Sequence, residues 1–128
     1  MATKLWVADA LAILAESLSP LPHEINELDW KASLSAHKDR LAEHLMAMAN
    51  QPNGGVLVFG INNDGVVAGV SSSEVEQTIG TLANLGRGAI EPPLALDHAV
   101  VDHSPGIAVL LVKIPNPPSN PRSAAASR

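Results

Sequence analysis

Acidic residues and one lysine lie close together in the first quarter of the chain: Glu24, Glu27, Asp29 and Lys31. Carboxylates that converge can hold divalent cations, which activate water and stabilise the charge that develops when a phosphodiester is cleaved. In an extended segment the same residues form a solvated strand surface, on which Lys31 pairs with a neighbouring acid. Surface carboxylates are the commonest kind, so we favour this second interpretation.

A basic group offers a different chemistry, because Lys and Arg on an exposed helix can contact the phosphates of a nucleic acid. Its members are Lys31, Lys38, Arg40 and Arg87. Asp39 and Glu43 interleave with them, and a mixed, salt-bridged surface explains them equally well. The formal net charge of −5 lacks the basic footprint of most tight nucleic-acid binders. Binding of this kind therefore requires a local patch.

The segment from Asn50 to Gly55 ends in two glycines, which is also a feature of phosphate-binding loops. A P-loop, however, needs a lysine and a hydroxyl residue before a helix, whereas these glycines precede an apolar strand. We interpret the segment as a helix C-cap in which Asn50 takes the left-handed conformation. The chain has no cysteine and no histidine pair with zinc-site spacing, so we predict no cofactor.

Apolar periodicity predicts an α/β (α+β) domain with three helices and a mixed sheet of about five strands, arranged in two layers. Helices are expected at 4–18 and 36–49 and from Ser73 onward, where Ser73 and Glu76 suggest a capping box. Strands are expected at 24–32, 56–61, 66–70, 94–102 and 107–114. The predicted core stripe of the first helix is Leu5, Ala8, Leu11, Ala12, Ala15 and Leu18. Trp6, Trp30 and Phe59 have apolar neighbours and are expected in the core.

No apolar run approaches the ~20 residues of a membrane span, and Asp9 interrupts the first apolar stretch as it would not in a signal peptide. We therefore expect a cytoplasmic protein. Residues 1–22 are interpreted as a helix and linker, 23–115 as one domain, and 116–128, rich in Pro, Ser and Ala, as a poorly ordered tail.

Three segments, taken in order, resemble one known family, and Ile90-Glu91-Pro92 is a weaker fourth. The three are Glu24-x4-Asp29-Trp30-Lys31, Ala47-Met48-Ala49-Asn50-x3-Gly54-Gly55-Val56-Leu57-Val58-Phe59-Gly60-Ile61, and Asn62-Asn63-Asp64-Gly65-Val66-Val67-Ala68-Gly69-Val70. Over residues 23–115 the chain resembles the Schlafen-type Alba-like domain, with Asn50, Gly54, Gly55, Gly60 and Gly65 as structural motif positions. That family usually continues into a strand with Tyr-x-Arg, and this chain has no tyrosine.

The resemblance implies a non-catalytic module that binds DNA or RNA within a larger bacterial transcriptional regulator, with a further domain C-terminal to it. The binding residues would be Lys31, Lys38, Arg40 and Arg87. In eukaryotic relatives the fold carries a metal-dependent ribonuclease centre, so the alternative is a nuclease using Glu24 and Asp29. Its third acid falls on Asn62 or Asn63, and Asp64 is the nearby carboxylate that could replace it as a metal ligand.

A third hypothesis is an oligomerisation domain. The apolar strand at 107–114 would lie at a sheet edge and pair with a second copy of the chain. We therefore expect a homo-oligomer.

Overall fold

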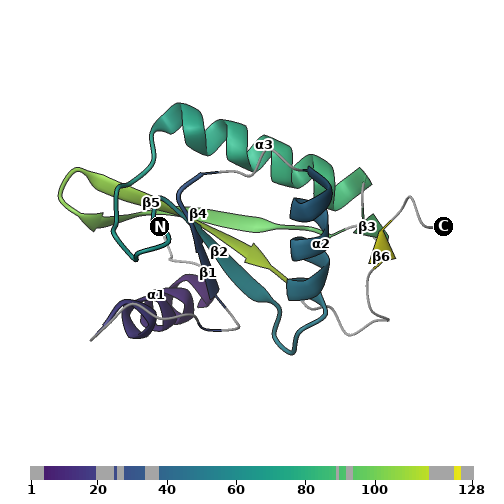
Figure 1. Ribbon diagram of the computed structural model, residues 1–128, viewed down its shortest axis with the longest axis horizontal. Coiled ribbons are helices and arrows are strands. Elements are labelled where there is room, and N and C mark those ends of the chain that lie inside the picture. The colour runs from purple at the N-terminus through teal and green to yellow at the C-terminus, as the bar shows by residue number, and fades with distance from the viewer. Residues whose placement is uncertain are drawn as a thin grey trace.

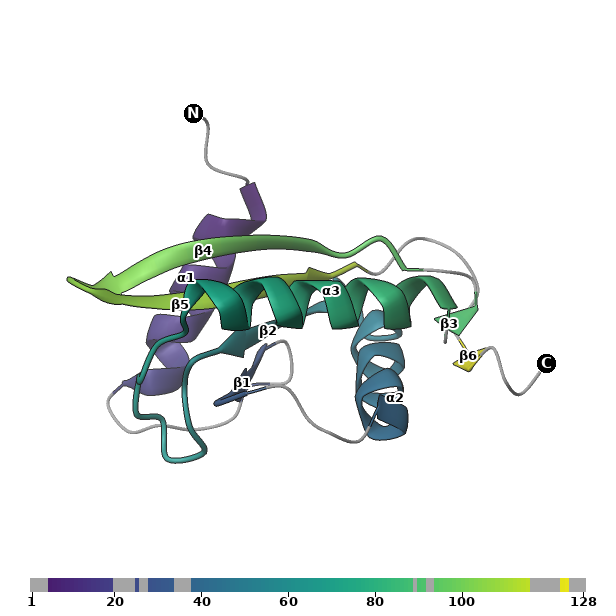
Figure 2. The same cartoon turned by 90° about the horizontal axis from the view of Figure 1, so that it is seen from above.

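The computed structural model describes residues 5–19, 25, 28–33, 38–88, 90–91, 94–115 and 123–124. A central sheet lies between helix α1 on one side and helices α2 and α3 on the other (Figures 1 and 2). The elements in chain order are α1 (Leu5–Leu18), β1 (Leu28–Lys31), α2 (Lys38–Ala49), β2 (Gly55–Phe59), α3 (Ser72–Gly88), β3 (Ile90–Glu91), β4 (Asp97–Ser104), β5 (Ile107–Ile114) and β6 (Ser123–Ala124).

The main sheet has four strands in the order β1-β2-β5-β4, and only β1 and β2 are parallel. The α+β class and the mixed sheet are as predicted. β5 lies between β2 and β4, so the prediction that the 107–114 strand forms an edge was wrong. A separate pair joins β3 to β6, whose two residues are the described part of the 116–128 segment.

The strand predicted at 66–70 does not form. One isolated bridge joins Ile61 to Val67, and the chain then folds back so that the Gly60 carbonyl accepts the N–H groups of Ala68 and Gly69. Gly60 has a φ of 111°, and a Cβ there would lie 3.1 Å from the backbone of Gly69. The glycines therefore make a compact loop in place of a fifth strand.

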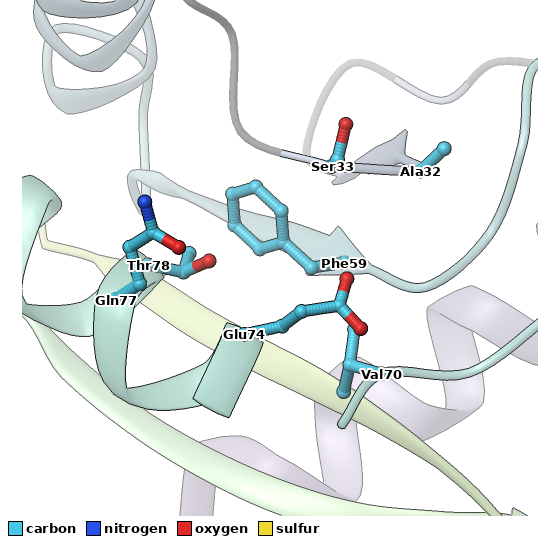
Figure 3. A pocket seen from close by; sticks show the side chains of 7 residues that line it. All are labelled: Ala32, Ser33, Phe59, Val70, Glu74, Gln77 and Thr78. Atoms are coloured by element: carbon cyan, nitrogen blue, oxygen red, sulfur yellow. The ribbon is translucent and has the colours of Figure 1, made fainter. Parts of the chain in front are cut away.

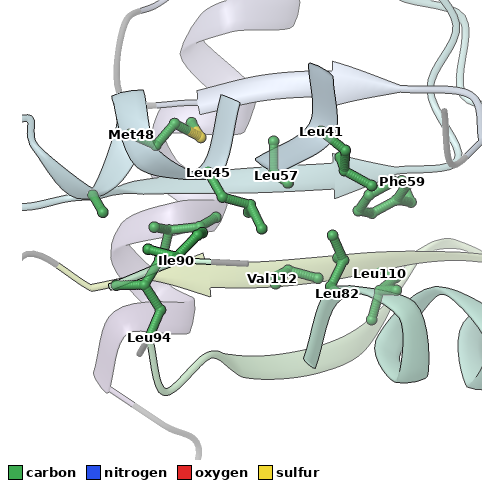
Figure 4. Close-up of a cluster of buried hydrophobic side chains, with 12 residues drawn as sticks. Leu41, Leu45, Met48, Leu57, Phe59, Leu82, Ile90, Leu94, Leu110 and Val112 are labelled. Atoms are coloured by element: carbon green, nitrogen blue, oxygen red, sulfur yellow. The ribbon is translucent and has the colours of Figure 1, made fainter. Parts of the chain in front are cut away.

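Both faces of the sheet are covered, so the fold has three layers and not the two expected. On the α2–α3 face a cluster of twelve buried apolar residues packs around Leu45, Leu57, Phe59 and Leu110 (Figure 4). On the α1 face a second cluster includes Leu14, Val58 and Leu111. All five residues of β2 are buried, as predicted for a strand covered on both sides.

Helix α1 turns a different face to the sheet from the one predicted. Its buried residues are Val7, Ala10, Leu14 and Ser17, whereas Leu5 is 91% and Leu11 39% exposed. Two indole hydrogen bonds anchor this orientation: Trp6 Nε1 donates to Asp97 Oδ2 at 2.7 Å, and Trp30 Nε1 donates to Ser17 Oγ at 3.1 Å. Because the helix is apolar almost all round, periodicity alone could not choose its buried face.

Helix α3 begins earlier than predicted. The capping box is formed by Ser71 and Glu74: the Ser71 N–H donates to Glu74 Oε1 at 3.0 Å, and the Glu74 N–H donates to Ser71 Oγ at 3.2 Å. Ser73 and Glu76 have the same spacing but lie inside the helix. Of the two Ser-x-x-Glu boxes that the sequence offers, the one nearer the N-terminus is therefore the one that forms.

Three further boundaries differ from the predictions. β1 begins at Leu28, whose N–H donates to the Ile25 carbonyl in a turn, and residue 24, where the predicted strand begins, lies outside the described residues. After α2 the left-handed residues are Asn53 (φ 68°) and Gly54 (φ 67°), so the cap assigned to Asn50 was misplaced. Leu94 packs on the end of α3, where its N–H donates to Gly86, and β4 therefore starts only at Asp97.

Candidate nucleic-acid interface

The carboxyl end of β1 carries the main group of charged residues. Along this strand Leu28 and Trp30 pack on the α1 side, so the alternation of side chains directs Asp29 and Lys31 to the α2–α3 side. Asp29 Oδ2 lies 3.2 Å from Lys31 Nζ and 3.5 Å from His44 Nε2 of α2. We call these three residues the Asp29 cluster. The N–H groups of Gly60 and Ile61 donate to the Lys31 carbonyl and tie this end of β1 to the loop after β2.

Lys31 supplies most of the positive charge of the Asp29 cluster at neutral pH, because His44 is mainly uncharged there. Burial lowers the pKa of the His44 imidazole below its ordinary 6.5, and the positive charge of Lys31 lowers it further, while the Asp29 carboxylate acts in the opposite direction. At neutral pH His44 is therefore mainly uncharged. Asp29 and Lys31 remain as an ion pair whose side chains are 34% and 23% exposed, and both can be reached from solvent.

The other basic residues predicted to bind are less closely tied to this cluster. Arg40 is exposed on α2, one helical turn before His44 and so on the same face. Arg87 is exposed in the last turn of α3 and donates to Asn84 Oδ1. The side chain of Lys38 lies outside the described residues. Within the described part of the chain no contact links Arg40 or Arg87 to Lys31.

A metal centre is not assembled by the residues that the structure describes, among which no three His, Asp or Glu side chains are placed to hold an ion. Glu24 lies outside them. Asn62 Oδ1 accepts the N–H groups of Asp64 and Val66, so this amide stabilises its own turn. Asp64 is exposed at the tip of that turn. The nuclease hypothesis therefore depends on a residue whose position is not described.

The glycine motif has a structural role here. Gly54 and Gly55 are buried, and Gly55 is the first residue of β2, paired with Ile114. The Lys113 side chain donates to the Asn53 carbonyl at 2.8 Å. These contacts belong to the amino end of β2, at the opposite end of the strand from the Asp29 cluster.

Sequence reasoning missed a cavity of about 150 Å³ beside the carboxyl ends of β1 and β2 (Figure 3). Its lining residues are Ala32, Ser33, Phe59, Val70, Glu74, Gln77 and Thr78. They come from three separate segments, and Phe59 had been interpreted only as a core residue. The one sequence signal that could have indicated the site was the capping box at Ser71 and Glu74, which fixes where α3 begins.

A family model described as Schlafen, AlbA_2 matches residues 24–128. The chain belongs to this family. The family resemblance predicted from the sequence is thereby confirmed. No curated protein sequence matches the chain.

Two solved structures share the fold of this Schlafen AlbA_2 domain. One is the N-terminal domain of a protein from Nitrosomonas europaea named as related to the ATP-dependent DNA helicase RecG, with a TM-score of 0.65 and 21% identity over 93% of this chain and 82% of that one. The other is the DIP2311 protein from Corynebacterium diphtheriae, with a TM-score of 0.56 and 18% identity over 95% of this chain. The chain spans 24% of the Corynebacterium protein.

The described helices of this Schlafen AlbA_2 domain include none that is both long and apolar enough to cross a membrane.

Proposed function

We propose that this Schlafen AlbA_2 domain is a non-catalytic module that binds nucleic acid at the carboxyl end of β1. The observation that carries the proposal is the position of Lys31. It is a partly exposed cation at the end of an edge strand, and Asp29 holds its ammonium group at 3.2 Å. An ammonium has three donors and Asp29 takes one, so the others can contact phosphate oxygens.

Arg40 extends this positive surface along α2, since it shares a helix face with His44 of the Asp29 cluster. Lys38 and Arg87 are assigned a supporting part. The family match and the fold shared with the domain of a protein named for its relation to a DNA helicase support the choice of ligand class. The net charge of −5 requires that contact be local and strongly weakened by salt.

Fluorescence anisotropy with labelled single-stranded and duplex DNA and RNA, measured across a salt series, tests the proposal. Lys31→Gln should weaken binding of every sequence and reduce the salt slope by about one unit, because one phosphate contact is lost. Arg40→Gln should act in the same direction. Lys113→Gln is the matched control, because this lysine lies at the other end of the sheet. Binding that is absent at low salt, or equal losses for Lys31 and Lys113, would contradict the proposal.

A metal-dependent nuclease is the second candidate. The observation that favours it is the exposure of the Asp29 carboxylate, 34%, beside Lys31. Cleavage of labelled single-stranded RNA and DNA with manganese would be compared between the native domain and the Glu24→Gln and Asp29→Asn variants. Metal-dependent cleavage that both variants abolish would establish this activity, and its absence would leave the non-catalytic function.

The proposal extends to the setting of the domain: a cytoplasmic transcriptional regulator with further domains C-terminal to this one. The small share of the Corynebacterium protein that the chain spans supports a modular arrangement.

Association of two copies is also proposed. β5 is internal, so of the two edge strands, β1 and β4, the one assigned to this pairing is β4, the partner of β5 in the last hairpin. Light scattering of the purified domain measures its mass in solution, and a monomer at all concentrations would exclude this association.

A further inference from the structure

The Thr78 hydroxyl lines the cavity beside β1, β2 and α3. Thr78 is 7% exposed, and its side chain has no hydrogen-bond partner among the described residues. Figure 3 shows the hydroxyl on the cavity side of α3, across from Ser33. Buried polar groups are almost always hydrogen-bonded, so this one indicates a place for a ligand atom or a water.

The size of the cavity sets the size of its occupant. Its volume is about 150 Å³, and engineered protein cavities of about that volume bind one benzene molecule. The ring of Phe59 lies between the segment of Ala32 and Ser33 and the first turns of α3 (Figure 3), and it lines the space although the residue is only 1% exposed. The space, which is partly open to solvent, therefore has room for one six-membered ring.

The lining also sets the chemistry of that ring. The described residues that line the cavity include a carboxylate and no Lys or Arg, so these residues favour an amino group over an anionic group. Glu74 contributes a carboxylate at the wall, and its Oε1 accepts the Ser71 N–H. Its second oxygen is an acceptor suited to an amino group. A carboxylate that accepts from the exocyclic amine is the usual side-chain partner of cytosine.

We propose that the cavity takes one unstacked cytosine base of a single strand, with its amino group on Glu74 and its polar ring edge on the Thr78 hydroxyl. Lys31 immediately precedes Ala32 in the chain, so the phosphate contact lies next to the base. This inference rests on the proposed function and deepens it. It assigns base preference to the cavity and affinity to Lys31, a division typical of nucleic-acid interfaces.

The test compares labelled oligo(dC), oligo(dT) and oligo(dA) by fluorescence anisotropy at one salt concentration. Oligo(dC) should bind at least about fivefold more tightly than the other two, the smallest discrimination expected from one well-placed base contact. Thr78→Val, which keeps the shape and removes the hydroxyl, should reduce this preference while the variant stays folded. Chemical-shift changes on adding cytidine monophosphate should centre on Phe59, Glu74 and Thr78.

Glu74→Gln is the sharper variant, because glutamine also serves in a capping box and keeps α3 capped. Its amide can donate to the O4 atom of thymine, so the preference should move from oligo(dC) towards oligo(dT). Glu76→Gln removes the same charge from an exposed position of α3 outside the cavity and should leave the preference unchanged. Lys31→Gln should weaken all three oligonucleotides and keep their order.

The outcomes separate the two proposals. If no oligonucleotide binds, the proposed function itself fails. If oligonucleotides bind through Lys31 with no base preference, or with one that Thr78→Val and Glu74→Gln do not change, the cavity holds only water and this inference is wrong while the binding function stands.

Discussion

Two buried polar side chains of the described residues differ in their hydrogen bonding: Ser17, on the α1 face of the sheet, is paired, whereas Thr78, on the α2–α3 face, is not. Ser17, fully buried, donates to the Leu14 carbonyl and accepts the Trp30 indole N–H. Thr78 is almost as deeply buried and has no partner in the described part of the chain. Both faces bury apolar clusters, so they differ in whether the buried hydroxyl group has a hydrogen-bond partner. The paired Ser17 stabilises the fold, whereas the Thr78 hydroxyl is available to a ligand.

The largest expected effects test whether the two faces contribute equally to stability. Leu110 and Leu111 are adjacent in β5 and both 0% exposed, but Leu110 packs in the α2–α3 cluster and Leu111 in the α1 cluster. Each change to alanine should lower the free energy of unfolding by about 2–5 kcal/mol, as for other buried leucines. Urea denaturation measures both. A loss below about 1 kcal/mol for Leu111→Ala would mean that α1 packs only loosely on the sheet.

Two variants with intermediate expected effects on the free energy of unfolding test the difference between Ser17 and Thr78. Ser17→Ala removes the acceptor of the partly buried Trp30 indole N–H and should cost about 0.5–1.5 kcal/mol, the usual net contribution of one hydrogen bond. Thr78→Val removes a hydroxyl that has no partner among the described residues, and it should be neutral or slightly stabilising. Thermal denaturation of the two variants gives the comparison. A similar loss in both would show that Thr78 does have a partner.

The smallest effect is the pH dependence that His44 contributes. The pKa of its folded state lies below that of the unfolded chain, so the unfolded state binds more protons in the interval between the two values. This contribution to stability is complete above about pH 6.5 and is lost as the pH falls towards the lowered pKa. His44→Gln should flatten the stability profile in this interval when it is measured by urea denaturation at a series of pH values. An unchanged profile would place the titrating group elsewhere.

The sequence was a good guide to what patterns encode locally. Helix α2, the apolar strands β2 and β5, and the acidic-aromatic-lysine segment at 29–31 all follow from periodicity or motif. The sequence did not predict the correct structure where two alternatives fitted the same pattern equally well. Helix α1 has apolar residues on several sides, and its long-range hydrogen bonds help to select the buried face. The serine run before α3 offered two capping boxes of the same spacing, and the spacing could not tell which one forms.

The candidate site was predicted in part for a similar reason. Asp29 and Lys31 were identified because they are charged and close in sequence, and the structure joins them to His44. The cavity could not be found this way. It depends on Phe59 and Thr78, which are ordinary core residues in a pattern and become lining residues only through the crossing of β2 and α3.

The position of α1 has a practical consequence for anyone who shortens this protein. The family match begins at residue 24, after the helix has ended. A fragment cut at that boundary would present Val58, Val109 and Leu111 to water, since these three belong to the cluster that α1 covers. Such a fragment is expected to aggregate on expression, so binding assays need the polypeptide from its first helix onward.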